Sequence, residues 1–288
     1  MLIDAHQHYW RYDPKTYGWI GPGMEVLAQD WLPAQFEPVR QANGIDATIA
    51  VQARGNEDDT AFLMQLARQA RWIAGIVGWV DLRADGVSDR LAHWRAHGPL
   101  VGIRHQVQDE PNPSACLADA AFDRGVAAVQ RARLVYEVLV RHEHLEAATV
   151  FCARHDDHAL VLDHLGKPDI GGTGDTFERW QRQIRALAAM PHVSVKISGL
   201  VTEAPRDPDG RLALDGIGRH LDAALECFGP RRVLFGSDWP VSQLATDYPH
   251  VLALAQDWAQ SRGLSVPERE CLFGGNAIDI YGDALRLP

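Results

Sequence analysis

The sequence predicts an α/β fold of the (β/α)8 TIM-barrel class, formed as a single domain over residues 1–288. Eight short, β-branched apolar segments turn polar at their C-terminal ends, as strands buried on both faces of a parallel sheet do. Amphipathic helical patterns lie between these segments, and 288 residues are enough to bury a barrel core. An open, doubly wound sheet is the alternative that the same alternation leaves open.

The strands and helices can be placed in chain order. The predicted strands occupy residues 2–9, 46–53, 73–81, 100–108, 134–141, 159–166, 193–200 and 232–241. The clearest helical patterns occupy residues 33–44, 60–72, 177–190, 214–228 and 248–263, with a closing helix or pair of short helices over 267–282. Asn43-Gly44 is a typical helix stop. Residues 202–216 are predicted to form a long loop after the seventh strand.

The composition is that of an ordinary globular protein, with 46% hydrophobic and 23% charged residues. The formal net charge is −10 without a basic cluster, which argues against a nucleic-acid partner. No apolar run is long enough to span a membrane, and the N-terminus lacks a signal-peptide pattern. The four cysteines form no CxxC pair and are expected to be reduced and mostly buried. We therefore expect a cytoplasmic enzyme.

Polar residues gather where the predicted strands end. In a parallel barrel these ends form one face, which is where barrel enzymes bind and transform their substrates. The residues concerned are His6, His8, Arg104, His105, Asp163, His164, Lys167, Lys196, Ser198 and Asp238. We therefore expect the active site at this end of the barrel.

The HxH pair of the first strand indicates a metal-binding or acid-base site. Side chains two apart on a strand point the same way, so His6 and His8 share a face, and Ile3 and Ala5 are expected to face the covering helices. Asp238 ends the last strand, which lies beside the first when a barrel closes. Two imidazoles and a carboxylate would give one divalent ion, zinc above all, three ligands and leave a position for water.

Several motifs together resemble those of the amidohydrolase superfamily, in its amidohydrolase-2 branch. They are DAHQH (4–8), DHLGKP (163–168), KISG (196–199), GSDWP (236–240) and GGNAIDIYG (274–282), in family order over nearly the whole chain. The stretch HQHYWRYDPKTYGWI (6–20) is similar to the sugar-lactonase subgroup, whose members open lactones such as L-fuconolactone, L-rhamnonolactone and D-galactonolactone. The branch also contains pyrone-dicarboxylate lactonases and decarboxylases of aromatic acids. The resemblance implies the barrel fold and a small-molecule sugar lactone as substrate.

One feature departs from many metal-dependent members of this superfamily. These carry a Lys or His ligand on the fifth strand, whereas LVYEVLVR (134–141) offers only Glu137 as an internal ionisable residue. This argues against a two-metal centre. Some lactonases of the branch are thought to work without a metal, so the need for one ion stays open.

We expect hydrolysis of a neutral aldonolactone to the aldonate. Asp238 is the predicted general base, acting on water directly or with the help of a metal ion held by His6, His8 and Asp238. Without an ion, the two histidines would donate hydrogen bonds to the carbonyl oxygen. The predicted donors to the tetrahedral oxyanion are Arg104, His105 and His164, and Lys196 is predicted to orient hydroxyls or stabilise developing charge.

Aromatic residues are predicted to bind the sugar ring. The long loop 10–31 contains Trp10, Tyr12, Tyr17, Trp19 and Trp31, and Trp10 is the main candidate, with Trp79 and Trp239 at strand ends. A lid whose aromatic residues only bury one another is the alternative for the loop. For the whole chain, the alternatives are a metal-dependent decarboxylase of an aromatic acid and a non-catalytic sugar-binding barrel. A homodimer is compatible with such a barrel.

Overall fold

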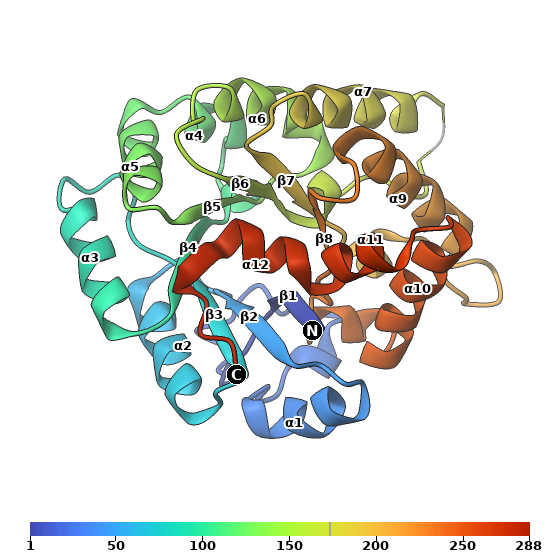
Figure 1. The fold of residues 1–288 in the computed structure, drawn as a ribbon, viewed down its shortest axis with the longest axis horizontal. Helices are drawn as coiled ribbons and strands as arrows, with labels where there is room; N and C mark the ends of the chain where they lie inside the picture. The colour runs from blue at the N-terminus through green and yellow to red at the C-terminus, as the bar shows by residue number, and fades with distance from the viewer. Residues whose placement is uncertain (173) are drawn as a thin grey trace.

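The computed structural model of the chain describes residues 1–172 and 174–288. Eight parallel strands form one sheet in the order of the sequence, and Figure 1 shows them as a ring with the helices outside. The strands are β1 (Ile3–Gln7), β2 (Ala47–Val51), β3 (Ile73–Gly78), β4 (Leu100–His105), β5 (Val135–Val138), β6 (Leu160–Leu162), β7 (Val193–Lys196) and β8 (Val233–Leu234). Each lies within a predicted segment, so the predicted (β/α)8 barrel is confirmed.

Helices lie between the strands, and they include one for each of the predicted helical patterns. They are α1 (Pro33–Ala42), α2 (Glu57–Gln69), α3 (Val87–His97), α4 (Pro113–Leu117), α5 (Ala120–Arg131), α6 (Leu145–Cys152), α7 (Thr176–Ala188), α8 (Leu200–Glu203), α9 (Leu214–Phe228), α10 (Tyr248–Ser261), α11 (Val266–Glu270) and α12 (Asn276–Tyr281). Short helical turns include η1 (Glu25–Leu27), η2 (Val107–Asp109), η4 (Asp163–Gly166) and η5 (Val241–Leu244). Within the described part of the chain, no helix has the length and hydropathy needed to cross a membrane.

The first strand and the end of the last strand close the barrel. The Ala5 amide donates to the Phe235 carbonyl at 3.0 Å, and the His8 amide donates to the Trp239 carbonyl at 2.7 Å. Between them, the Asp238 amide donates to the His6 carbonyl at 2.8 Å. The predicted neighbourhood of the HxH pair and Asp238 therefore follows from backbone pairing.

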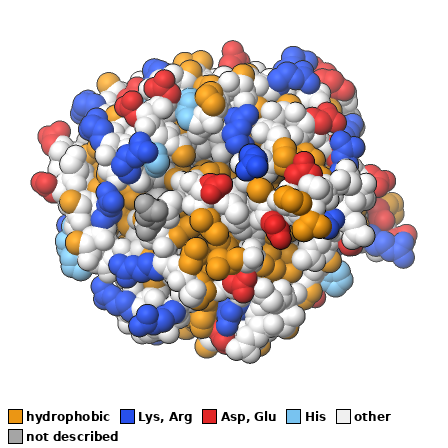
Figure 2. Space-filling view, viewed as in Figure 1, with side chains coloured by type: hydrophobic (Ala, Val, Ile, Leu, Met, Phe, Trp, Pro, Cys, Tyr) orange, Lys and Arg blue, Asp and Glu red, His pale blue; other side chains and the backbone are white. Residues whose placement is uncertain are grey.

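The C-terminal helix α12 lies across one end of the barrel (Figure 1). Its Ala277 and Tyr281 belong to an apolar cluster with interior residues of the strands, among them Val135 and Val161. Figure 2, which has the same view, shows this end as a continuous surface with hydrophobic side chains near its centre. The opposite end carries the residues that follow the strands.

A β-bulge in β1 changes which side chains face inward. Between Asp4 and Gln7 the strand has one residue more than its partner β2. Ile3 and Ala5 consequently join the interior cluster covered by α12, so the expectation that they face the outer helices is wrong. Asp4 instead accepts hydrogen bonds from the hydroxyl groups of Ser237 and Tyr248. An extra residue shifts the two-residue alternation, and this shift brings His6 into the barrel below His8.

Candidate active site

Three predicted ligands converge at the open end of the barrel. The Nε2 atoms of His6 and His8 are 3.2 Å apart. Asp238 Oδ1 lies 3.7 Å from the first and 3.3 Å from the second of these atoms. All three residues are at least 95% buried. The geometry predicted from the HxH spacing and the closing strand is therefore present.

This triad fits one divalent metal ion. With metal–ligand bonds of about 2.1 Å, a tetrahedral site places its ligand atoms roughly 3.4 Å apart, close to the separations of 3.2, 3.3 and 3.7 Å. His8 Nδ1 lies 2.8 Å from the Val51 carbonyl, so it must carry the proton, and Nε2 presents its lone pair to the site. The Arg104 Nη1 atom lies 3.3 Å from His6 Nε2, so this nitrogen faces a guanidinium donor as well as His8 and Asp238.

Two further groups of potential ligands are less suited to a metal. Asp163 lies near His6 and His164, but its carboxylate is already paired with Arg104 at 3.1 Å and Lys196 at 3.4 Å. The other group is His105, Glu110 and Cys116. There the Arg83 guanidinium lies 3.1 Å from Glu110 and 3.2 Å from Cys116 Sγ, where it would repel a metal ion.

The backbone at the site is held in an unusual conformation. Both His164 and Asp238 have positive φ, at 54° and 58°. This left-handed conformation is unfavourable for residues with a Cβ atom and is concentrated at functional sites. Gly199 and Gly236 allow the close packing: an added Cβ would lie 2.6 Å from His164 Nδ1 in the first case and 2.6 Å from His6 Cβ in the second.

The ionisation states follow from burial and from the neighbouring charges. Burial lowers the pKa of His6 well below its ordinary value, although Asp163 opposes this. Burial also lowers the pKa of His164 to about 4, against the opposing effect of Asp238. For Asp238, burial would raise the pKa, but His164, His8 and His6 together lower it well below its ordinary value. His6 and His164 are therefore neutral and Asp238 is ionised at neutral pH.

A buried network of charges lies beneath the triad. Arg104 pairs with Asp163 at 3.1 Å, and Lys196 pairs with Glu137 at 2.6 Å. Lys196, Glu137 and Asp163 are completely buried. Such charges are tolerated inside a protein only when they are paired, and here two cations face two carboxylates.

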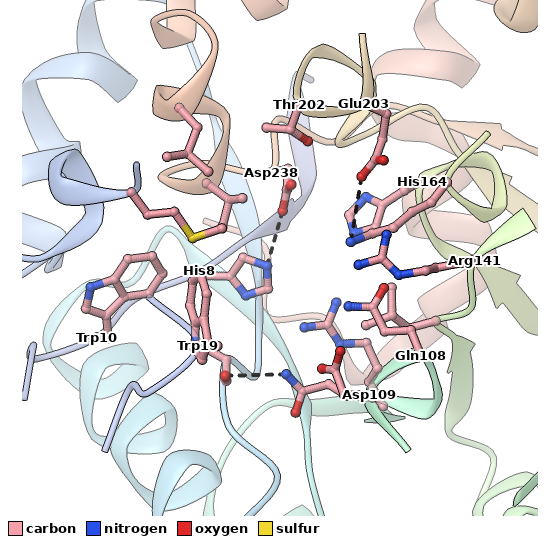
Figure 3. Close-up of a pocket in the computed structure, with 18 residues that line it drawn as sticks. His8, Trp10, Trp19, Gln108, Asp109, Arg141, His164, Thr202, Glu203 and Asp238 are labelled. Atoms are coloured by element: carbon pink, nitrogen blue, oxygen red, sulfur yellow. Dashed lines mark hydrogen bonds and ion pairs between the residues drawn. The ribbon is translucent and has the colours of Figure 1, made fainter. Parts of the chain in front are cut away.

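A cavity of about 360 Å³ opens above the triad. His8, Arg104, His164 and Asp238 line its floor, and Figure 3 shows His8 and Asp238 in contact there. One wall is largely apolar and the other largely polar. The apolar side chains are Trp10, Trp19, Met24, Ala53, Leu139, Val241 and Leu244, and the polar ones are Gln106, Gln108, Asp109, Arg141, Lys167, Thr202 and Glu203. The cavity can thus accept a small ligand with one apolar and one hydrogen-bonding face.

The loop 10–31 contributes to this cavity and also packs on itself. Trp10 and Trp19 both line the cavity, with ring centroids 5.7 Å apart in an edge-to-face arrangement. Trp10 is fully buried, and its indole N–H donates to the Gln29 carbonyl at 2.9 Å. Tyr17 and Leu27 belong to the same apolar cluster. The loop therefore has a self-packed face and a face that lines the cavity, and its role as a sugar platform stays a prediction.

Besides the completely buried His6, four predicted site residues do not line the cavity. Trp239 is completely buried and packs against Trp31 and Phe36, outside the barrel. Trp79 donates to His105 Nδ1 at 3.2 Å, and His105 Nε2 lies 2.7 Å from Glu110. Both His105 and Trp239 directly follow residues that point into the barrel, so strand alternation turns them outward.

Lys196 is the fourth, and for a different reason. It points into the barrel but lies beneath the cavity with no exposed surface. The structure thus places Lys196 outside the cavity lining, away from where substrate hydroxyls would lie.

The polar wall contains residues that the sequence prediction missed. Gln106 and Gln108 continue the alternation that starts at Arg104, and Leu139 and Arg141 continue the one that starts at Glu137. Extending each strand by two and four residues would have found all four, because residues two apart share a face. Thr202 and Glu203 lie on α8, which the sequence pattern had placed in a loop.

Comparison with known proteins agrees with this geometry. The amidohydrolase family profile matches residues 3–282. The chain belongs to the amidohydrolase family. Over 98% of its length it is 50% identical to an L-fucono-1,5-lactonase of Burkholderia multivorans, covering 96% of that protein. A second L-fucono-1,5-lactonase, from Burkholderia ambifaria, is 33% identical over 97% of this chain and 94% of its own.

Solved structures of the amidohydrolase family resemble this one closely. A crystal structure of an amidohydrolase from Burkholderia multivorans with bound zinc has a TM-score of 0.93 and 49% identity, with complete coverage of both chains. Another crystal form of an amidohydrolase from the same species, with bound HEPES, has a TM-score of 0.93 at 48% identity. The predicted resemblance to this family is therefore confirmed.

Proposed function

We propose that the chain hydrolyses a neutral sugar lactone, of the L-fucono-1,5-lactone or D-galactono-lactone type, to the aldonate. The observation that carries this proposal is the convergence of His6 with His8 and Asp238, the last two lining the floor of a cavity with one apolar and one polar wall. The curated relatives with 50% and 33% identity are both named L-fucono-1,5-lactonase. A sugar lactone has an apolar ring face and a rim of hydroxyl groups, which such a cavity complements.

In this proposal Asp238 accepts a proton from the attacking water. The water oxygen bonds to the lactone carbonyl carbon, the bond from that carbon to the ring oxygen then breaks, and the proton passes to the departing oxygen. The low pKa of Asp238 makes it a weak base toward ordinary water, because general bases work best when their pKa is near the working pH. The direct route considered from the sequence is therefore disfavoured relative to one with metal assistance.

One divalent ion, with zinc as the first candidate, is proposed to be held by His6, His8 and Asp238. When bound, such an ion acidifies water and polarises a carbonyl group. The convergence of three lone-pair donors at 3.2 to 3.7 Å supports this, as does the neutral state expected for His6.

His164 and Arg104 are proposed to stabilise the tetrahedral oxyanion. Ser198 Oγ lies 2.9 Å from His164 Nδ1. If that hydroxyl donates, Nε2 carries the proton of the neutral ring and can donate to an oxyanion in the cavity. Arg104 contributes a fixed positive charge on the cavity floor. His105, Trp79 and Trp239 have no part in the proposal, because they do not reach the cavity.

The alternatives considered from the sequence are not favoured. The relatives with the highest identities given above are named as lactonases, which speaks against the aromatic-acid decarboxylase. A non-catalytic sugar-binding barrel has no use for a buried carboxylate facing three imidazoles. We further propose a cytoplasmic location, which agrees with four free cysteines, two of them buried. The homodimer stays a prediction that light scattering can test.

A panel of sugar lactones tests the proposed reaction, with proton release followed by a pH indicator. The expected result is turnover of L-fucono- or D-galactono-type lactones and loss of at least about 10³-fold in kcat for Asp238→Asn, which keeps the shape but removes the base. Asp209→Asn, at an exposed position in the loop before α9, is the matched control and should retain full activity. Carbon dioxide release from an aromatic acid without lactone turnover would overturn the proposal.

A further inference from the structure

A chain of buried polar contacts leads from the C-terminal helix to the triad. The Tyr281 hydroxyl on α12 donates to Glu137 Oε1 on β5. The same oxygen accepts from Lys196 Nζ on β7 at 2.6 Å. Lys196 Nζ in turn lies 3.2 Å from Nδ1 of His6. Three strands and the closing helix thus contribute to one column along the barrel interior.

At His6, a donor and an acceptor both face Nδ1, and the one that bonds to it decides which ring nitrogen carries the proton. Nδ1 has a donor, Lys196, at 3.2 Å and an acceptor, Asp163 Oδ1, at 3.4 Å. If Lys196 donates to Nδ1, the neutral ring carries its proton on Nε2, which then cannot bind a metal. If Nδ1 carries the proton and donates to Asp163, the Nε2 lone pair faces His8, Asp238 and the Arg104 guanidinium, whose Nη1 atom lies 3.3 Å away and favours the same tautomer.

Glu137 and Tyr281 favour the tautomer in which His6 Nδ1 carries the proton and donates to Asp163. The shortest contact of the Lys196 ammonium is the one to Glu137, which draws it away from His6 and also leaves Asp163 able to accept from Nδ1. Tyr281 fixes the shared oxygen of Glu137 from the opposite side, and its ring lies 5.7 Å from Lys196 Nζ. None of these three residues lines the cavity, so substrate contact does not explain them.

We propose that Tyr281, Glu137 and Lys196 act as positioning residues that hold His6 in the tautomer with a free Nε2, so that the closing helix determines how tightly the site binds a divalent metal. The inference rests on the metal site of the proposed function. It assigns α12 a role in the site, although the helix covers the opposite end of the barrel. Groups that orient a metal ligand commonly change metal affinity by 10 to 100-fold when they are removed.

Zinc affinity of the metal-free protein tests the column, measured by competition with a chromophoric chelator. Glu137→Gln should weaken zinc binding at least tenfold, since it leaves Lys196 without its counter-charge. Tyr281→Phe keeps the ring and should weaken it two- to fivefold. Ile280→Ala is the packing control on the same helix, and it should leave the affinity within twofold of wild type.

The double variant E137Q/K196M separates positioning from simple structural support. It removes the competing donor together with its partner, so zinc affinity should recover to within about threefold of wild type. A purely structural role predicts a double variant at least as weak as E137Q. That result, or unchanged affinity in E137Q, would overturn the inference.

Histidine ¹⁵N NMR of the metal-free protein gives a readout that does not need the metal. Wild type should show His6 protonated on Nδ1, and E137Q should move the proton to Nε2. If wild type binds no zinc but E137Q still moves the His6 proton to Nε2, the proposed metal site is wrong and the proposed control of the His6 tautomer is supported. If wild type binds zinc and the tautomer does not change in E137Q, the column fails and the metal site stands.

Discussion

Gly199 sits where a single methyl group should damage the site more than the fold. Its φ is +67°, and a Cβ atom there would lie 2.6 Å from His164 Nδ1 and 2.9 Å from the adjacent ring carbon. Ordinary contact begins at 3.4 Å, so the ring would be about 0.8 Å too close and would have to move. Gly199→Ala therefore combines a backbone penalty with displacement of His164, the proposed oxyanion donor.

The two effects have different magnitudes. An alanine in the left-handed region costs about 1 to 2 kcal/mol of unfolding free energy, and forcing a buried ring aside costs about 1 to 3 kcal/mol more. Misplacing a catalytic group by about 1 Å costs on the order of 10²-fold in rate, so we expect kcat/KM for the lactone to fall roughly 10- to 100-fold. Urea unfolding measures the first effect and the lactone assay the second.

Gly210→Ala is the matched control for this prediction. Gly210 has φ of +80° in an exposed turn before α9, and none of the described residues has an atom within 4 Å of the position that an added methyl group would take. The control should lose about 1 to 2 kcal/mol of stability and keep its activity. If Gly199→Ala loses no more stability than Gly210→Ala and keeps full kcat/KM, the assigned contact between Gly199 and His164 does not matter for function.

Three further predictions concern the cavity, the metal and the closing strand. Trp19→Ala should raise KM for the lactone, because Trp19 lines the cavity. Trp239→Phe should lower the free energy of unfolding by about 1 to 3 kcal/mol and leave KM unchanged, because Trp239 is buried outside the cavity. Steady-state kinetics and urea unfolding check both predictions, and a raised KM for Trp239→Phe would contradict its placement. Removal of metal by a chelator should reduce kcat more than tenfold, and added zinc should restore it, because Asp238 alone is a weak base. Full activity of protein that elemental analysis shows to be metal-free would refute this prediction. Burial raises the pKa of Asp4 from 3.8 to about 6, so the folded state binds a proton more tightly than the unfolded state and loses about 3 kcal/mol of stability as the pH rises from about 4 to about 6. Asp4→Asn does not have this pH dependence. Urea unfolding should therefore show that the difference in unfolding free energy between wild type and Asp4→Asn falls by about 3 kcal/mol between pH 4 and pH 7. A difference that does not change with pH would contradict the raised pKa of Asp4.

The sequence was sufficient for the barrel because its strands are buried on both faces. Runs such as 46–53 and 159–166 contain β2 and β6, whose residues ATIAV and LVL are almost entirely apolar, as a parallel sheet covered on both faces requires. Closure of the barrel then placed Asp238 beside His6 and His8 without any further information. The candidate ligands were thus predictable from topology.

The side-chain directions at strand ends were less predictable, although part of the information was present. Arg104 and His105 are adjacent, so both could not point into one cavity, and alternation favoured Gln106 instead. The bulge in β1 is different, since nothing in IDAHQ marks an extra residue. The burial of Lys196 depends on partners from β5, η4 and α12, which no local pattern connects.

The contacts that close the barrel are also the contacts that assemble the site. The Asp238 amide donates to the His6 carbonyl, so one hydrogen bond joins the last strand segment to the first and brings a carboxylate to an imidazole. Asp4 adds a second connection by accepting from the Ser237 amide at 2.9 Å. The positive φ of Asp238 persists because both neighbours of this residue are anchored in this way. Metal binding and barrel closure should therefore be thermodynamically linked: an ion that binds the triad would stabilise the closed barrel, and a change that opens the β1–β8 seam would lower the ion's apparent affinity in proportion to the fraction of metal-free protein that remains closed.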